Sequence, residues 1–253
     1  MTITITQEHI AKLIAIESGV HYAELPPPGR NPFVAISRPS PVLLSAPHGA
    51  ITYRHNDREE WHEEDEYTAG MALLLGELCQ TSVIAITWRN EEEDPNYYGA
   101  SHSKYRQALK QLVDDNGIQW VIDLHGASSV TRRMKMLRWV DLGTRKTTPS
   151  LAAVHRERLK DLLEDQLGTG RVSHNGFPAE ENDRTITAYS HGTLGISAVQ
   201  VEMRPAVRVA FRRTDASGFT EQGPFSAQPE HVIGMLQALA DFIFYLTSET
   251  EDS

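Results

Sequence analysis

Short apolar runs alternate along the chain with longer segments in which apolar residues recur at helical spacing. The short runs are typical of buried strands and the longer segments of amphipathic helices. Such an alternation predicts an α/β fold, in which helices cover both faces of a sheet. The predicted strands are residues 41–47, 82–88, 119–126, 134–143 and 197–205, and the predicted helices are residues 8–17, 63–80, 103–117, 150–168 and 229–249.

Proline and glycine mark where these elements are interrupted. Residues 23–32 contain four prolines and a glycine and therefore predict a loop. Residues 168–195 predict loops and a short strand, and the part around residues 177–187 is a candidate lid or specificity wall. Neither an internal repeat nor a low-complexity linker divides the chain. We therefore expect residues 1–253 to form a single domain.

Polar residues suited to chemistry stand at the carboxyl ends of four predicted strands. In α/β folds, ligands gather at this edge of the sheet, where loops and helix N-termini converge. Four strand ends that all carry such groups predict one shared site. The residues are His48, Arg89 with Asn90, His125, and Glu202 with Arg204.

His48 and His125 occupy equivalent positions after buried strands and form the strongest candidate pair. Imidazole suits zinc and similar divalent ions, and a catalytic zinc usually has three protein ligands. We expect the third ligand from residues 62–66, which also supply acids to the first turn of the predicted helix 63–80. Asp123 lies two residues before His125 on the same side of its strand, where its carboxylate can orient the imidazole. The third-ligand candidates are His62, Glu63, Glu64, Asp65 and Glu66, and His62 with Glu66 has the spacing of an exposed helix pair.

Glu202 lies within a β-rich run and has two interpretations. It is either the partner of a structural salt bridge to a basic residue such as Arg204, or a general base beside the metal. Arg204 and Arg89 can each hold a substrate carboxylate through the planar guanidinium. Neither a glycine-rich phosphate loop nor a G-x-S-x-G elbow is present, so nucleotide binding and serine hydrolysis lack support.

The composition narrows the classes of partner. The formal net charge is −10, which argues against nucleic acid or an anionic membrane as the main partner. The single cysteine, Cys79, cannot form an intramolecular disulfide or a zinc–thiolate cluster. The N-terminus has neither the basic nor the apolar region of a signal peptide, and we find no apolar run of about 18 residues. We expect a cytoplasmic protein that acts on a small molecule.

Five segments together resemble the N-formylglutamate amidohydrolase family, which is related to the zinc carboxypeptidases. They are "SAPHG", "EEDEYTAG", "TWRN", "VIDLHG" and "VQVEMR", and they occur in the family's order over roughly residues 41–210. The resemblance implies a three-layer α/β/α sandwich around a mixed central sheet, with the phosphorylase/hydrolase-like arrangement of the zinc carboxypeptidases. It also implies hydrolysis of a linear amide with one divalent ion, normally Zn²⁺, although another divalent metal is compatible.

Carried over by position, the resemblance makes His48, Asp65 and His125 the metal ligands, with Glu64 as the alternative acid. It makes Glu202 the catalytic glutamate and Arg204 a second catalytic and substrate-binding residue. Arg89 and Asn90 match a segment that contacts substrate. The function implied is cleavage of a small N-acyl amino acid such as N-formylglutamate. The alternatives are a carboxypeptidase-like or other deacylating metallohydrolase, and a binding protein without catalytic activity on the same fold.

Overall fold

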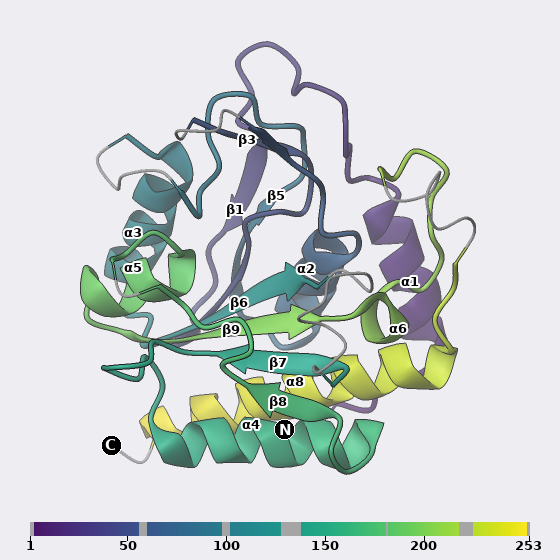
Figure 1. Ribbon diagram of the computed structural model, residues 1–253, viewed down its shortest axis with the longest axis vertical. Coiled ribbons are helices and arrows are strands. Elements are labelled where there is room, and N and C mark those ends of the chain that lie inside the picture. Colours follow the sequence, from purple (N-terminus) through teal and green to yellow (C-terminus); the bar gives the residue numbers. More distant parts are fainter. Residues whose placement is uncertain are drawn as a thin grey trace.

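The computed structural model describes residues 3–55, 60–97, 102–127, 138–180, 182–217 and 225–251. Within them a seven-stranded sheet forms the centre of the molecule, with strand order β1-β5-β2-β6-β9-β7-β8 (Figure 1). A separate two-stranded sheet pairs β3 with β4. The strands are β1 (Phe33–Ile36), β2 (Val42–Ala46), β3 (Thr52–Arg54), β4 (Glu60–His62), β5 (Ser82–Ile86), β6 (Trp120–Gly126), β7 (Val140–Gly143), β8 (Val172–His174) and β9 (Ser197–Met203).

The large sheet is mixed. Strands β5, β2, β6 and β9 are parallel to their neighbours in this order, whereas β1 is antiparallel to β5 and β7 is antiparallel to β9. The edge strand β8 is parallel to β7. The carboxyl ends of the four central parallel strands therefore meet at one edge of the sheet, as the sequence predicts.

Helices cover both faces of this sheet, which confirms the expected α/β/α architecture. Helices α3 and α5 pack against strands on one face, and α2 and α8 pack against strands on the other (Figure 1). Helix α1 lies on α2 and α8, while α4 and α6 pack against α8. The helices are α1 (Gln7–Glu17), α2 (Thr68–Leu78), α3 (Lys104–Asn116), α4 (Ala153–Leu167), α5 (Ile186–Gly192), α6 (Pro205–Arg208) and α8 (Pro229–Glu251).

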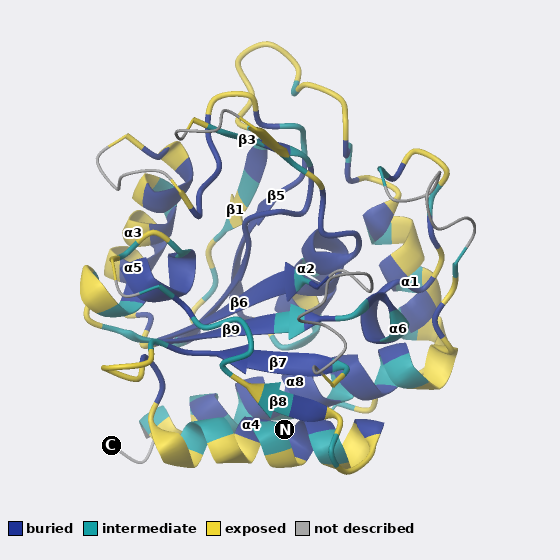
Figure 2. Ribbon diagram, in the orientation of Figure 1, coloured by how far each residue is buried: buried dark blue, intermediate teal, exposed yellow. Residues whose placement is uncertain are grey.

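Strands β2 and β5 are buried along their whole length. Every residue of β2 and β5 is buried, and Figure 2 shows the middle of the sheet in the colour of buried residues. Parallel strands covered on both faces have continuous apolar sequences rather than alternating ones, and "VLLSA" and "SVIAI" follow this rule. The core therefore fixes where His48 and His125 leave the sheet.

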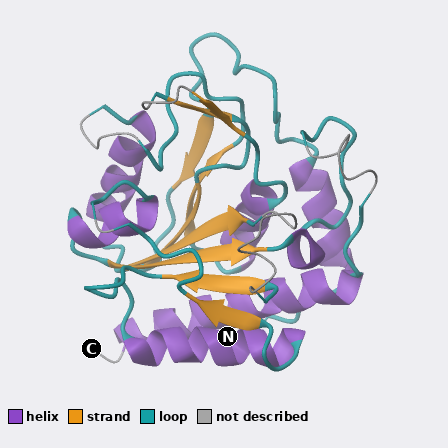
Figure 3. Ribbon diagram, in the orientation of Figure 1, coloured by secondary structure: helices purple, strands orange, loops and turns teal. Residues whose placement is uncertain are grey.

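The secondary structure differs from the sequence prediction at three places near the site. Helix α2 begins at Thr68 and not at Glu63, so the acids of residues 63–66 precede the helix instead of forming its first turn. The hairpin β3–β4 and the short helix α5 were not predicted (Figure 3). Of the predicted strand 134–143, β7 covers residues 140–143, and residues 134–137 lie outside the described residues.

Helix α8 is long and apolar enough to cross a membrane by length and composition alone. The core accounts for this composition. Its side chains Val232, Leu236, Leu239 and Ile243 are fully buried, and the helix packs against α4, α1 and the sheet. Core helices of globular proteins commonly have such a composition, so the helix is weak evidence for a membrane span.

Candidate metal centre

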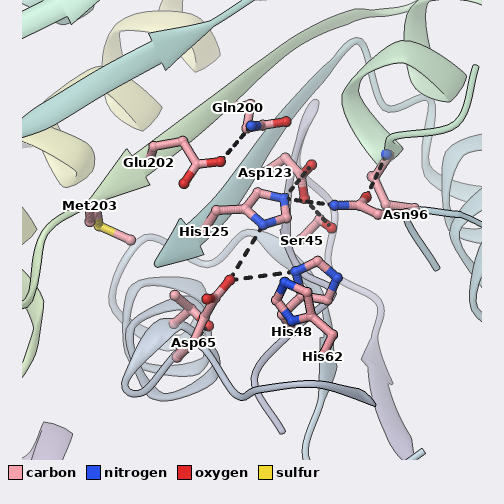
Figure 4. A network of polar contacts seen from close by, with 12 residues as sticks. Ser45, His48, His62, Asp65, Asn96, Asp123, His125, Gln200, Glu202 and Met203 are labelled. Carbon is pink, nitrogen blue, oxygen red and sulfur yellow. Dashed lines mark hydrogen bonds and ion pairs between the residues drawn. The ribbon is translucent and has the colours of Figure 1, made fainter. Parts of the chain in front are cut away.

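Three ligand-type side chains converge at the carboxyl edge of the sheet. His48 follows β2, His125 lies near the end of β6, and Asp65 lies in the connection before α2. All three are buried, and their ligand atoms lie within 4.8 Å of one another. Figure 4 shows the Asp65 carboxylate facing both imidazoles. The structure therefore brings together the three residues that the family resemblance names as metal ligands.

The same nitrogen of each histidine faces the aspartate. Nδ1 of His48 and Nδ1 of His125 both lie 3.5 Å from Oδ2 of Asp65. The backbone N–H of Asp65 also donates to the carbonyl of His48 at 2.7 Å, so two of the three residues are joined through the main chain. Glu64, the alternative acid, points elsewhere, because its Oε1 accepts hydrogen bonds from the backbone N–H and the hydroxyl of Ser217.

The other nitrogen of each histidine contacts a buried carboxylate. Nε2 of His48 lies 2.8 Å from Oδ1 of Asp94, and Nε2 of His125 lies 3.1 Å from Oδ2 of Asp123. Both aspartates are fully buried. A carboxylate on one ring nitrogen fixes the imidazole tautomer and leaves the lone pair of the other nitrogen for a metal. Asp123 thus has the contact that the sequence predicts for it, whereas the contact of Asp94 with His48 was not predicted from the sequence.

Asp94 belongs to a buried loop that ties both histidines to the rest of the fold. Its Oδ2 accepts from Nε of Arg54 at 2.6 Å, and its Oδ1 also accepts from the backbone N–H of Asn96 at 2.9 Å. The side chain of Asn96 lies 3.4 Å from Nε2 of His125 and accepts from the N–H of Ile186 at the start of α5. One loop therefore positions the imidazoles of two different strands.

The electrostatics of the cluster favour charged groups despite their burial. Burial alone would raise the pKa of Asp65, but the neighbouring imidazoles of His125 and His48 hold it well below its usual value. Burial likewise would lower the pKa of His125, but Asp123 and Asp65 raise it well above its usual value. Without a cation, two imidazoles have to supply the positive charge that balances these carboxylates. A divalent ion at the same place would supply it directly.

The donor set fits a divalent metal ion. Nδ1 of His48 is buried without a hydrogen-bond partner among the described residues, although imidazole nitrogens are costly to leave unpaired. Two imidazole nitrogens and one carboxylate oxygen form a donor set found in catalytic zinc sites, where a further position stays open. We conclude that His48, Asp65 and His125 form a candidate metal site.

Glu202 lies beside His125 on the neighbouring strand. The two residues are directly opposite each other in the parallel pairing of β6 with β9, so their side chains leave the same face of the sheet. Oε1 of Glu202 accepts from Nε2 of Gln200 at 2.6 Å. Burial raises the pKa of Glu202 to about 7, with His125 opposing the rise. A carboxylate with this pKa can gain and lose a proton near neutral pH.

A cavity of about 660 Å³ opens in front of the cluster. Phe177, Pro178, Glu180 and Thr185 line one side of it, so part of the segment predicted as a lid or specificity wall does border the site. Its backbone is held in place by Asp141, whose carboxylate accepts from the N–H groups of residues 176 and 177. The other lining residues are His48, Arg54, His62, Asp65, Asn96, Tyr97, His125, Gly126, Ala127, Lys146, Asn175, Gly176, Gln200 and Glu202.

His62 is part of this cavity wall, and the expectation of an exposed helix pair with Glu66 was wrong. The residue ends β4, and its ring stacks on that of His48 with centroids 3.9 Å apart. Nδ1 of His62 lies 2.6 Å from the carbonyl of Glu63, so this nitrogen carries the proton. Burial, aided by the charge of His48, lowers the pKa of His62 to about 3. Glu66 is instead buried and pairs with Arg212 at 3.0 Å.

The structure does not bring the predicted substrate-binding residues to the wall of this cavity. The guanidinium of Arg89 lies over the ring of Trp61 and pairs with Glu91 at 2.7 Å. Asn90 is buried, and its side-chain oxygen accepts from the N–H of Glu92. Arg204 precedes α6 and is not among the residues that line the cavity. The roles of Arg89, Asn90 and Arg204 stay predictions.

The turn that presents Asp65 is fixed from helix α1. Tyr67 has a left-handed backbone (φ 68°) and gives α2 no side-chain cap. The buried carboxylate of Glu17 takes the place of a cap and accepts from the N–H groups of Tyr67 and Gly70. Thr68 in turn donates to the carbonyl of Asp65 through both its N–H and its hydroxyl. A residue far from the site thereby holds a candidate metal ligand in place.

Comparison with known proteins gives a result for the fold only. No family model and no curated protein matches the sequence. Among solved structures, N-formylglutamate amidohydrolase from Ralstonia eutropha is similar, with a TM-score of 0.53, 15% identity, and coverage of 87% of this chain and 98% of that chain. A gene product of Agrobacterium tumefaciens gives a TM-score of 0.54 with 13% identity and covers 88% of this chain and 97% of that chain.

A metallo-carboxypeptidase from Burkholderia cenocepacia is also similar, with a TM-score of 0.48, 13% identity, and coverage of 96% of this chain and 70% of that chain. The family resemblance in the sequence motifs is thus accompanied by likeness of fold to an N-formylglutamate amidohydrolase. At these identities the likeness shows the fold and leaves the chemistry to the residues of the site.

Proposed function

We propose that this protein is a zinc-dependent amidohydrolase that cleaves the amide of a small N-acyl amino acid, such as N-formylglutamate. The observation that carries the proposal is the convergence of His48, Asp65 and His125, with Glu202 beside them on the next strand. The N-formylglutamate amidohydrolase with a similar fold supports the same reaction class. His48, Asp65 and His125 would hold the ion.

The ion would polarise the amide carbonyl and lower the pKa of water, which is the chemistry that zinc supplies in hydrolases. The chain supplies the proton transfer. Glu202 has a pKa raised to about 7, so its carboxylate can accept the proton of the attacking water and then donate it to the departing amine. Gln200 donates to one carboxylate oxygen of Glu202 and leaves the second oxygen for this transfer.

Two measurements test the proposal. Elemental analysis should find about one zinc ion per chain, and the ion should be lost in His48→Ala and His125→Ala, since each removes one of three ligands. Hydrolysis should then be measured on a panel of N-formyl and N-acetyl amino acids and short peptides. Preference for the peptides would identify a carboxypeptidase-like enzyme, and binding without turnover would identify a non-catalytic protein.

Glu202→Gln separates the catalytic role from a structural one. The variant should keep its metal and lose turnover by about 10²- to 10⁴-fold, the range for loss of a general acid–base group. Glu157→Gln is the matched control, because Glu157 pairs with Arg156 on the exposed surface of α4, away from the cavity, and undergoes the same chemical change. Full activity of Glu202→Gln would rule out the proposed proton transfer.

A further inference from the structure

Arg208 is a buried cation without an acidic partner. Its side chain is 5% exposed, and its Nε and Nη1 donate to the backbone carbonyls of Met203 and Glu66. No carboxylate of the described residues lies within 4.0 Å of its guanidinium. Charges are rarely buried unless they are paired, because their hydration is lost. The remaining nitrogen, Nη2, has no hydrogen-bond partner in the described part of the chain.

Other buried arginines of the described chain do not share this property. Arg212 pairs with Glu66, and the half-buried Arg54 pairs with Asp94. Arg106 also lacks an acidic partner, but all three of its nitrogens donate to carbonyls, those of residues 95, 183 and 184. Arg208 therefore differs in having neither an acidic partner for its charge nor a hydrogen-bond partner for one of its nitrogens among the described residues.

The guanidinium lines a second cavity, of about 330 Å³, that adjoins the first. The two cavities share Arg54, His62, Asp65 and Gly126 as lining residues. Of the acids that line this cavity, Glu66 pairs with Arg212, Glu64 accepts from Ser217, and Asp65 belongs to the candidate metal site. Arg208 is thus positioned to meet a group that enters from the candidate metal site.

Gly126 lets Arg208 and the candidate metal ligand Asp65 approach the same stretch of backbone closely. A Cβ atom at this position would lie 2.7 Å from Nη2 of Arg208 and 2.8 Å from Oδ1 of Asp65. Both distances are shorter than van der Waals contact, so a side chain at residue 126 would displace one of the two groups. The glycine directly follows His125, which places the guanidinium of Arg208 beside the cluster.

We propose that Arg208 and the cavity that it lines form a subsite for a carboxylate of the substrate. The planar guanidinium matches a carboxylate in shape and charge. This assignment rests on the proposed function for the rest of the substrate, and it limits the substrates to acids whose carboxylate lies close to the scissile amide. It also moves carboxylate recognition from Arg89 and Arg204, where the sequence predicts it, to a residue outside those motifs.

The test compares two probes that differ only in the carboxylate, N-acetylglycine and N-acetylglycinamide. Isothermal titration of the zinc-loaded protein should show that the acid binds about tenfold or more tightly than the amide, as expected for one charge-assisted contact. Arg208→Met should abolish this preference, and Arg208→Lys should retain part of it. Equal binding of the two probes by the wild type, or an undiminished preference in Arg208→Met, would overturn the proposal.

Two further variants make the result specific. Arg89→Met should keep the preference, whereas its loss there would return carboxylate recognition to the position that the motifs predict. Gly126→Ala places a methyl group 2.7 Å from Nη2 and 2.8 Å from Cζ of Arg208 and so displaces the guanidinium, and it should also lose the preference. It decides the question if Arg208→Met fails to fold, and its zinc content is measured in parallel because the added methyl group also approaches Asp65.

The experiments can refute the subsite and the proposed function independently of each other. If the wild type hydrolyses none of the panel but prefers the acid probe through Arg208, the proposed function is wrong and the subsite stands. If the wild type hydrolyses N-acyl amino acids and their amides equally well, the enzyme assignment stands and the subsite is wrong.

Discussion

Asp94→Asn tests whether the buried loop around Asp94 controls metal binding. Asp94 contacts Nε2 of His48 through one oxygen and Nε of Arg54 through the other, at 2.8 and 2.6 Å. Asparagine has nearly the same shape, but it replaces one oxygen by an NH₂ group and removes the negative charge. The NH₂ group then faces a donor of either Arg54 or His48.

The expected loss follows from these contacts. Replacing a carboxylate that orients a metal-bound histidine typically weakens metal binding by about 10- to 100-fold, or about 1.4–2.8 kcal/mol. Arg54 also loses its closest carboxylate, although Glu60 remains 3.5 Å away. Because the aspartate is fully buried, we expect the free energy of unfolding of the metal-free protein to fall by a further ~1–3 kcal/mol.

Competition for zinc with a chromophoric chelator measures the dissociation constant, and urea unfolding of the metal-free protein measures stability. Asp114→Asn is the matched control, because Asp114 pairs with Lys110 on the exposed surface of α3. The control should leave both quantities unchanged. A dissociation constant of folded Asp94→Asn within about threefold of wild type, against the minimum of about tenfold expected, would refute the role of Asp94.

Two further predictions concern groups around the site. Burial raises the pKa of Glu202 from 4.5 to about 7, so the metal-free native state holds this proton to higher pH than the unfolded state. The contribution of this proton to stability is present below pH 4.5 and is lost as the pH rises through 7. In urea unfolding with a chelator present, the wild type should therefore lose stability relative to Glu202→Gln between pH 5 and pH 8. Parallel curves of unfolding free energy against pH for the two proteins would contradict this sign. Gly70→Ala would place a Cβ 2.4 Å from Oε2 of Glu17 and displace the cap of α2. We expect a loss of ~1–3 kcal/mol in unfolding free energy and weaker zinc binding, whereas unchanged zinc affinity would show that Glu17 does not position Asp65.

Local sequence pattern was enough to predict the central strands of the sheet and the two histidines. The apolar runs ending before His48 and at His125 are strands β2 and β6, which are neighbouring and parallel. Parallel strands end at one edge, so a residue that follows each run has to lie near the other. The two-residue period of a strand likewise placed Asp123 beside His125, and the structure has this contact at 3.1 Å.

Local pattern could not distinguish between similar residues at loop positions. Four consecutive acids precede α2, and only Asp65 faces the histidines, because its N–H bonds to the carbonyl of His48 and Glu17 fixes the turn after it. Asp94 follows three glutamates in a loop, and nothing in that run marks it as the buried partner of His48. The helix prediction over 63–80 failed at its start for the same reason.

The sequence alone thus determined the central strands, the longer helices and the ends of the strands that carry His48 and His125. These features depend on side-chain periodicity over a few residues, which the chain has before it folds. The tertiary structure decided which carboxylates pair with the histidines and that His62 borders the cavity. It also decided that Arg208 is buried beside Asp65, whereas Arg89 lies over the ring of Trp61. These contacts join residues distant in sequence, and their energies depend on burial and distance, which exist only once the sheet and helices have packed.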